Sequence, residues 1–149
     1  MKRIYALERW CIDCKRCEVA CRAFHSKSRD AVRAYRVEGD GPKNRIWVEG
    51  TRTASLALNC RHCADPACVQ GCISGAMQKD PATGVVTVDQ QRSLCPFGAV
   101  RIEEVAGREV AIKCDLCGER LGEAGEPHCV AACPNRALIY VESEGGSHE

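Results

Sequence analysis

The residues with the most distinctive chemistry are cysteines, of which this chain of 149 residues contains thirteen. They fall into four groups, the third of which is a single residue. In order, the groups are Cys11-x2-Cys14-x2-Cys17-x3-Cys21, Cys60-x2-Cys63-x4-Cys68-x3-Cys72, Cys95 followed by Pro96, and Cys114-x2-Cys117-x11-Cys129-x3-Cys133 followed by Pro134. The first group has the spacing of bacterial iron–sulfur proteins, in which three cysteines bind one cluster and the fourth binds its neighbour. The predicted chemistry is therefore ligation of iron–sulfur clusters.

The spacing has a local physical reason. Two-residue gaps let a tight loop wrap a cubane, with thiolates directed at the irons and backbone N–H groups at the sulfides. A three-residue gap then carries the next thiol to a short helix that faces a second cluster. The longer gaps in the second and fourth groups leave this terminal step intact. A lone C-x2-C pair would favour zinc, whereas repeated pairs that each end in C-x3-C favour iron–sulfur clusters.

Two histidines, His62 and His128, lie beside cysteines in the sequence. Imidazole is a common zinc ligand, so these side chains would support a zinc site. The alternative is that both are loop histidines on a solvated surface, and this is the interpretation that we favour.

The composition points to the same chemistry. The apolar share of 45% includes the thirteen cysteines, and aromatic residues make up only 5%, so we expect the clusters to fill part of the core. With 21 basic and 20 acidic residues, the charge balance gives no case for nucleic-acid binding. No apolar run is long enough to span a membrane, and charges interrupt the first ten residues before a signal-peptide core could form. We therefore expect a cytoplasmic protein without disulfides or membrane insertion.

Short strands and turns separate the cysteine groups and must position them. The pattern predicts hairpins over 76–79 with 85–88 and over 99–102 with 110–113, and pairing of 4–7 with 137–141 and of 46–49 with 56–58. Short helices are expected at the three-residue steps, over 17–23, 68–72 and 129–133. The basic stretch 22–45 is interpreted as a solvated face, with a docking surface as the alternative. Residues 143–149 are expected to form a disordered tail.

The four cysteine groups, with Cys-Pro at Cys95 and Cys133, resemble the iron–sulfur electron-transfer subunits of molybdenum and tungsten oxidoreductases. This family includes the iron–sulfur subunits of dimethyl sulfoxide reductase, nitrate reductase and formate dehydrogenase. The resemblance runs from Lys2 to about Val141. It implies an α+β, ferredoxin-like fold of two fused modules in one polyferredoxin domain. Module A would comprise residues 1–24 and 108–142, and module B, residues 46–106, would be inserted in it.

The resemblance also implies how the cysteines are shared, because in this family the first group pairs with the fourth and the second with the third. Carried over to this chain, it gives three ligand sets: Cys11, Cys14, Cys17 and Cys133 for cluster 1; Cys114, Cys117, Cys129 and Cys21 for cluster 2; and Cys60, Cys63, Cys68 and Cys95 for cluster 3.

The third group departs from the family pattern. Three further cysteines should precede Cys95, but residues 89–94 contain none. A fourth cluster would need those thiols together with Cys72. Three clusters with four thiolates each use twelve of the thirteen cysteines, so we predict three [4Fe–4S] clusters and a buried, free thiol at Cys72.

The function implied is an electron relay that performs no bond chemistry of its own. Its partner would be a larger, catalytic subunit of the tungsten or molybdenum pterin type, with a further soluble electron carrier or subunit. The missing site is the one nearest the membrane anchor in four-cluster relatives. The chain therefore resembles the small subunits of tungsten enzymes of the aldehyde ferredoxin oxidoreductase type, including the class II benzoyl-CoA reductase complex. The alternatives are a free-standing polyferredoxin shuttle and a zinc-stabilised interaction module.

Overall fold

The computed structural model describes residues 1–51, 53–89, 100–118, 120–122 and 125–142. Its strands are β1 (Lys2–Ala6), β2 (Ile46–Gly50), β3 (Ser55–Asn59), β4 (Met77–Lys79), β5 (Val86–Val88), β6 (Arg101–Val105), β7 (Arg108–Ile112) and β8 (Leu138–Glu142). Its helices are the 3-10 turn η1 (Glu8–Trp10), α1 (Arg16–His25), α2 (Ala31–Arg36), α3 (Ala67–Gln70) and α4 (His128–Ala131). This is the small α+β fold of short helices and hairpins that the sequence predicts.

Within the described residues the strands form four antiparallel pairs, β1–β8, β2–β3, β4–β5 and β6–β7. All four predicted pairings are confirmed. The pair β1–β8 joins the two ends of the chain, with Ile4 opposite Tyr140. Because Ile4 is 1% exposed, this pair closes the core as well as the chain.

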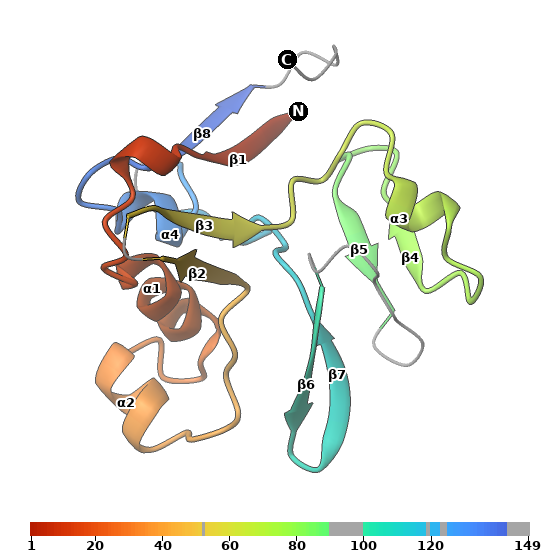
Figure 1. Ribbon diagram of the computed structural model, residues 1–149. Helices are drawn as coiled ribbons and strands as arrows, with labels where there is room; N and C mark the ends of the chain where they lie inside the picture. Colours follow the sequence, from red (N-terminus) through yellow and green to blue (C-terminus); the bar gives the residue numbers. More distant parts are fainter. Residues whose placement is uncertain (52, 90–99, 119, 123–124, 143–149) are drawn as a thin grey trace.

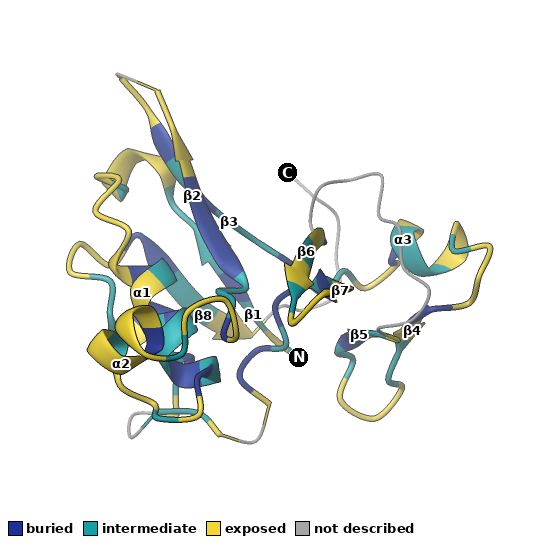
Figure 2. Cartoon of the chain, turned by 90° about the horizontal axis from the view of Figure 1, so that it is seen from below, coloured by how far each residue is buried: buried dark blue, intermediate teal, exposed yellow. Residues whose placement is uncertain are grey.

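The helices include one that the sequence analysis missed. Helices α1, α3 and α4 lie at the three-residue steps, as predicted, but α2 interrupts the basic stretch 22–45. The signal for α2 is Asp30, whose side chain caps the helix by accepting a hydrogen bond from the Arg33 N–H at 2.8 Å. Helix α2 is largely exposed, as Figure 2 shows, which agrees with the prediction of a solvated face.

The elements gather in two parts (Figure 1). Helices α1 and α4 pack with β1–β8 and β2–β3 in one part, and α3 packs with β4–β5 in the other, with β6–β7 between them. Among the described residues the larger apolar core has twelve buried members, and five are cysteines: Cys17, Cys21, Cys60, Cys114 and Cys129. A smaller core of Met77, Val86, Val100 and Ala111 joins β4–β5 of the second part to β7. In the described part of the chain, no helix has both the length and the apolar character needed to cross a membrane.

Candidate metal centres

The C-x2-C loops that open the first, second and fourth cysteine groups share one backbone feature. In each loop the residue directly before the second cysteine has a positive φ: 54° at Asp13, 47° at His62 and 56° at Leu116. Side chains other than glycine disfavour this left-handed conformation. A left-handed residue in a loop turns successive N–H groups toward a concave, anion-binding centre, as at many iron–sulfur sites. The loops therefore fit a group rich in sulfide and thiolate.

The cysteines of predicted cluster 1 share one cavity. This small cavity, of about 20 Å³, is bounded by all four of them: Cys11, Cys14, Cys17 and Cys133. Its wall is otherwise mostly apolar and includes Val48, Ala57 and Leu138. The backbone N–H of Ala137 donates to the Cys133 sulfur at 3.2 Å. Residues more than a hundred positions apart thus line one small apolar cavity with four cysteines on its wall.

The cysteines of predicted cluster 2 are all buried: Cys21, Cys114, Cys117 and Cys129. Burial raises the pKa of the Cys21 thiol to about 12, and the nearby Cys117 thiol adds to this rise. Burial also raises the pKa of Cys129 well above its ordinary value, and the nearby thiols of Cys21, Cys114 and Cys117 act in the same direction. Helix α1, the loop after β7 and helix α4 therefore bring these four thiols together.

Two of these sulfurs already accept backbone hydrogen bonds. The Arg45 N–H donates to the Cys21 sulfur at 3.2 Å, and the Leu116 N–H donates to the Cys114 sulfur at 3.4 Å. Hydrogen bonds to sulfur stabilise the thiolate and tune the potential of a bound cluster. The buried site thus has ligands and the beginnings of a supporting shell.

Three cysteines of predicted cluster 3 line a second cavity. It has a volume of about 440 Å³ and includes Cys60, Cys63 and Cys68, with Trp47 and Val86 in its apolar wall. The fourth predicted ligand, Cys95, lies outside the described residues. This cavity lies against the smaller core, because Met77, Val86 and Val100 line it, and Cys60 joins it to the larger core.

Neighbouring thiols connect the three sites. Burial raises the pKa of Cys129, and the nearby thiol of Cys17, which belongs to the first set, raises it further. The pKa of Cys114, raised to about 12 mainly by burial, is raised further by Cys60 of the third set. Cysteines of the second set therefore lie near one cysteine of each cavity, and all of these belong to the larger core.

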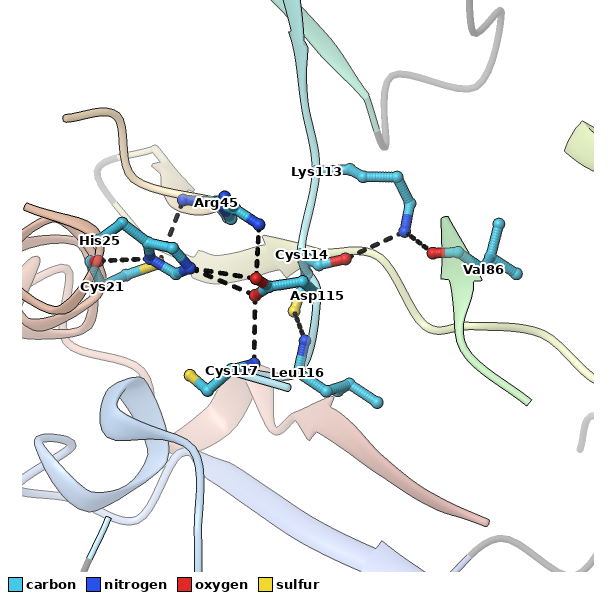
Figure 3. A network of polar contacts seen from close by, with 9 residues as sticks. All are labelled: Cys21, His25, Arg45, Val86, Lys113, Cys114, Asp115, Leu116 and Cys117. Atoms are coloured by element: carbon cyan, nitrogen blue, oxygen red, sulfur yellow. Dashed lines mark hydrogen bonds and ion pairs between the residues drawn. The ribbon is translucent and has the colours of Figure 1, made fainter. Parts of the chain in front are cut away.

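A polar network surrounds the second site (Figure 3). Arg45 donates to the Asp115 carboxylate at 2.6 Å, and the His25 ring lies 3.2 Å from the same group. Burial would raise the pKa of Asp115, but the His25 and Arg45 contacts outweigh it and lower the pKa to about 2. The Cys117 N–H also donates to Asp115, at 3.1 Å. This network was not predicted, because its members come from distant positions that the fold brings together.

Three predictions about single residues are wrong. His62 is fully buried rather than solvated, and its Nδ1 accepts a hydrogen bond from the Val86 N–H at 2.9 Å. Cys72 is half-exposed rather than buried, because it follows the last turn of α3 at the rim of the smaller core. Its sulfur contacts the Ser74 hydroxyl at 3.4 Å and accepts from the Met77 N–H at 3.4 Å. The prediction of a solvated loop position for His128 is also wrong, because His128 begins α4, is partly buried and stacks on Phe24, with ring centres 4.2 Å apart.

The described histidine, cysteine and carboxylate side chains include no group of three with the arrangement of ligands around one metal ion.

The chain is similar in sequence or fold to several known proteins. The chain is 36% identical to the B subunit of anaerobic dimethyl sulfoxide reductase from Escherichia coli strain K12, over 87% of this chain and 68% of that protein. It is 37% identical to the electron transport protein HydN of the same strain, over 89% of this chain and 83% of that protein. Two structures of the active-site complex BamBC of benzoyl coenzyme A reductase, one with zinc and one with benzoyl-CoA, align at TM-scores of 0.54 and 0.51.

Both alignments have 25% sequence identity. The alignment to the zinc complex covers 99% of this chain and 82% of the other, and the alignment to the benzoyl-CoA complex covers 95% and 79%, respectively. Residues 52–143 match the family described as the 4Fe-4S dicluster domain. The chain therefore belongs to the 4Fe-4S dicluster family of iron–sulfur proteins.

Proposed function

We propose that the protein relays single electrons through three [4Fe–4S] clusters, to or from a larger oxidoreductase subunit. The observation that carries the proposal is the row of three cysteine sites: a cavity lined by four cysteines, a buried set of four, and a second cavity lined by three. Relatives named as a reductase subunit and as an electron transport protein support it.

The ligand sets of this proposal are those that the sequence resemblance implies. Cluster 1 takes Cys11, Cys14, Cys17 and Cys133; cluster 2 takes Cys21, Cys114, Cys117 and Cys129; cluster 3 takes Cys60, Cys63, Cys68 and Cys95. Clusters 1 and 2 would belong to module A, and cluster 3 to module B.

The chain's own residues hold the thiolates, exclude water and set the local field. A bound [4Fe–4S] cluster supplies one-electron redox chemistry, with a potential set by hydrogen bonds to sulfur, burial and nearby charge. Burial of Cys21, Cys114, Cys117 and Cys129 limits access of water to the sulfurs of the second set. Because buried thiols have raised pKa values, loading the clusters must release protons from them.

The first cavity is the proposed contact with the catalytic partner. Cys14 is exposed, and beside it Trp10 and Ile12 are 51% and 62% exposed. Exposed apolar side chains next to a redox centre suit a protein interface better than open water. We propose that the partner is a tungsten or molybdenum pterin subunit, as the resemblance of the cysteine groups implies.

The first experiment is to count iron and acid-labile sulfide in protein purified without oxygen. About twelve of each per chain supports three cubanes, since each holds four irons and four sulfides. About sixteen means that a fourth cluster exists with an unusual ligand. Zinc with little iron would establish a zinc-stabilised module and overturn the proposed electron-transfer function.

A free-standing shuttle is the second candidate function. It would use the same cysteines, so the composition of the purified complex separates the two. Gentle purification that retains a larger subunit in fixed stoichiometry supports the relay subunit, whereas a monomer that reduces several acceptors supports the shuttle.

A further inference from the structure

A lysine side chain is buried where the two parts of the molecule meet. Lys113 follows β7 directly and is 5% exposed. Its Nζ donates to the carbonyl of Val86 on β5 and, at 3.0 Å, to the carbonyl of Cys114 (Figure 3). The same side chain lines the cavity of Cys60, Cys63 and Cys68. The ammonium group therefore lies between proposed clusters 2 and 3.

This charge lacks a carboxylate partner in the described part of the chain. The ion pairs there join other residues, and the nearest acid in sequence, Asp115, is bound by Arg45 and His25. Burying a charge is costly unless an opposite charge compensates it. Two carbonyl oxygens satisfy two of the three donors of an ammonium group, but they carry no net charge.

His62 supports the same interpretation from the other side of Val86. Val86 is 1% exposed, and its N–H is bound by His62 just as its carbonyl is bound by Lys113. The Nε2 atom of His62 is buried with no hydrogen-bond partner among the described atoms. The side chains of His62 and Lys113 thus both bind the backbone of Val86. His62 lies in the C-x2-C loop of the second cysteine group, and Lys113 directly precedes that of the fourth.

Clusters supply the missing negative charge. A [4Fe–4S] cluster held by four thiolates is anionic, and each electron that it accepts adds one more negative charge. We propose that Lys113 is the counter-charge of cluster 3, and that it raises the reduction potential of that cluster. This inference rests on the proposed three-cluster function and goes beyond it, because it assigns a potential-setting residue.

The sign of the effect follows from electrostatics. A nearby positive charge stabilises the reduced, more negative state, and a site shielded from water transmits this interaction more strongly than an exposed one does. Removing the charge therefore lowers the potential. The Coulomb interaction falls with distance, so an exposed lysine elsewhere should have no such effect.

The test is a redox titration of the cluster-loaded protein, followed by electron paramagnetic resonance. The variant Lys113→Gln can still donate a hydrogen bond to a carbonyl but has no charge, and Lys113→Arg keeps the charge. The matched control is Lys2→Gln, which removes a charge from an exposed position on β1. The cluster 3 signal is identified as the one that disappears in Cys68→Ser.

In Lys113→Gln we expect the oxidised-to-reduced ratio of cluster 3 at a fixed potential to rise about tenfold, a shift of about 59 mV to lower potential for a one-electron couple. Lys113→Arg and Lys2→Gln should leave that potential near the wild-type value. An unchanged potential in a Lys113→Gln protein with full iron content overturns this inference and leaves the three-cluster relay intact.

Loss of clusters is also informative. If Lys113→Gln binds less iron and Lys113→Arg binds the wild-type amount, the charge is required and the inference stands. If both variants lose iron alike, the role of Lys113 is steric and the inference is wrong. Wild-type protein without iron would overturn both this inference and the proposed function.

Discussion

Arg45 and Asp115, seventy positions apart, form an ion pair of 2.6 Å that fastens the basic stretch 22–45 to the C-x2-C loop of the fourth cysteine group. The pair is about one third exposed at each end. The backbone N–H of Arg45 also donates to the Cys21 sulfur, so one residue contacts the second site twice. The last residue of the basic stretch, Arg45, therefore has a structural role at the second site.

Replacing this carboxylate should weaken the holoprotein. In Asp115→Asn the Arg45 guanidinium loses its charged partner, so we expect a loss of about 1–3 kcal/mol, reduced by solvent screening at this partly exposed site. The measurement is the temperature at which the iron–sulfur absorbance bleaches. Asp40→Asn is the control, because Asp40 pairs with Lys43 from a side chain that is 95% exposed. An equal change in the two variants would contradict a special role for Asp115.

His62 should stabilise the fold through the acceptor atom of its ring and through its left-handed backbone conformation. The ring accepts from the Val86 N–H, and the residue has a φ of 47°. Leucine fills similar space but accepts no hydrogen bond, so His62→Leu should cost about 1–3 kcal/mol for the unpaired, buried N–H. Asparagine tolerates the left-handed region and offers an acceptor, so His62→Asn should lose less. Thermal bleaching compares the two, and a more stable leucine variant would refute the argument.

The sequence predicts the local parts of the fold well, for physical reasons. Turn residues and alternating apolar residues specify a hairpin such as β4–β5 without distant partners. The spacing of the cysteines likewise predicts α1, α3 and α4 at the three-residue steps. Helix α2 was missed because one capping aspartate amid basic residues is a weak signal.

The supporting residues of the site could not be predicted in the same way. His62 is buried by a strand more than twenty positions away, and Lys113 is buried by Val86 at a similar separation. A sequence shows that such residues are polar, and polar residues are mostly exposed, so the prediction of a solvated His62 followed the general trend. Only the packing of the two parts shows that these side chains lie inside.

Cys68 and Cys72 form a matched pair at helix α3, because they are alike in type and four residues apart. We expect Cys68→Ser to remove about four irons per chain, the content of one cubane. Cys72→Ser should leave the iron content unchanged, since the described contacts of this thiol are with a hydroxyl and backbone N–H groups. Iron and sulfide analysis of both variants, purified without oxygen, decides the assignment. Equal loss in both would place Cys72 among the ligands.

Cys72 should also be the thiol that takes up a chemical label in the holoprotein. The Ser74 hydroxyl and the Met77 N–H lower its pKa, whereas burial raises the pKa of Cys21 and Cys114. Thiolate reacts with iodoacetamide, and cluster ligands are shielded by iron, so holoprotein should take up about one label per chain. Peptide mass spectrometry locates the label, and Cys72→Ser should abolish it. Several labels on intact holoprotein would show that the ligand set is smaller than proposed.

Removing the clusters should unfold much of the chain. Five of the twelve buried residues in the larger core are cysteines, so the apoprotein would have to bury thiols around empty space in place of bound clusters. Metal binding and folding are coupled in such proteins, because the binding free energy supplies stability that the apolar residues lack. After anaerobic chelation we expect far-ultraviolet circular dichroism to lose most of its structured signal, and urea to give no cooperative transition.

The matched control for this experiment is the same protein passed through the procedure without chelator, which should keep its signal and its iron. Restoring iron and sulfide to the chelated protein should recover both, since the loops need clusters and not a covalent change to fold. A chelated protein that still unfolds cooperatively in urea would show that the side chains alone stabilise the fold. The clusters would then add little to stability, and the left-handed residues in the C-x2-C loops of the first, second and fourth cysteine groups would need another explanation.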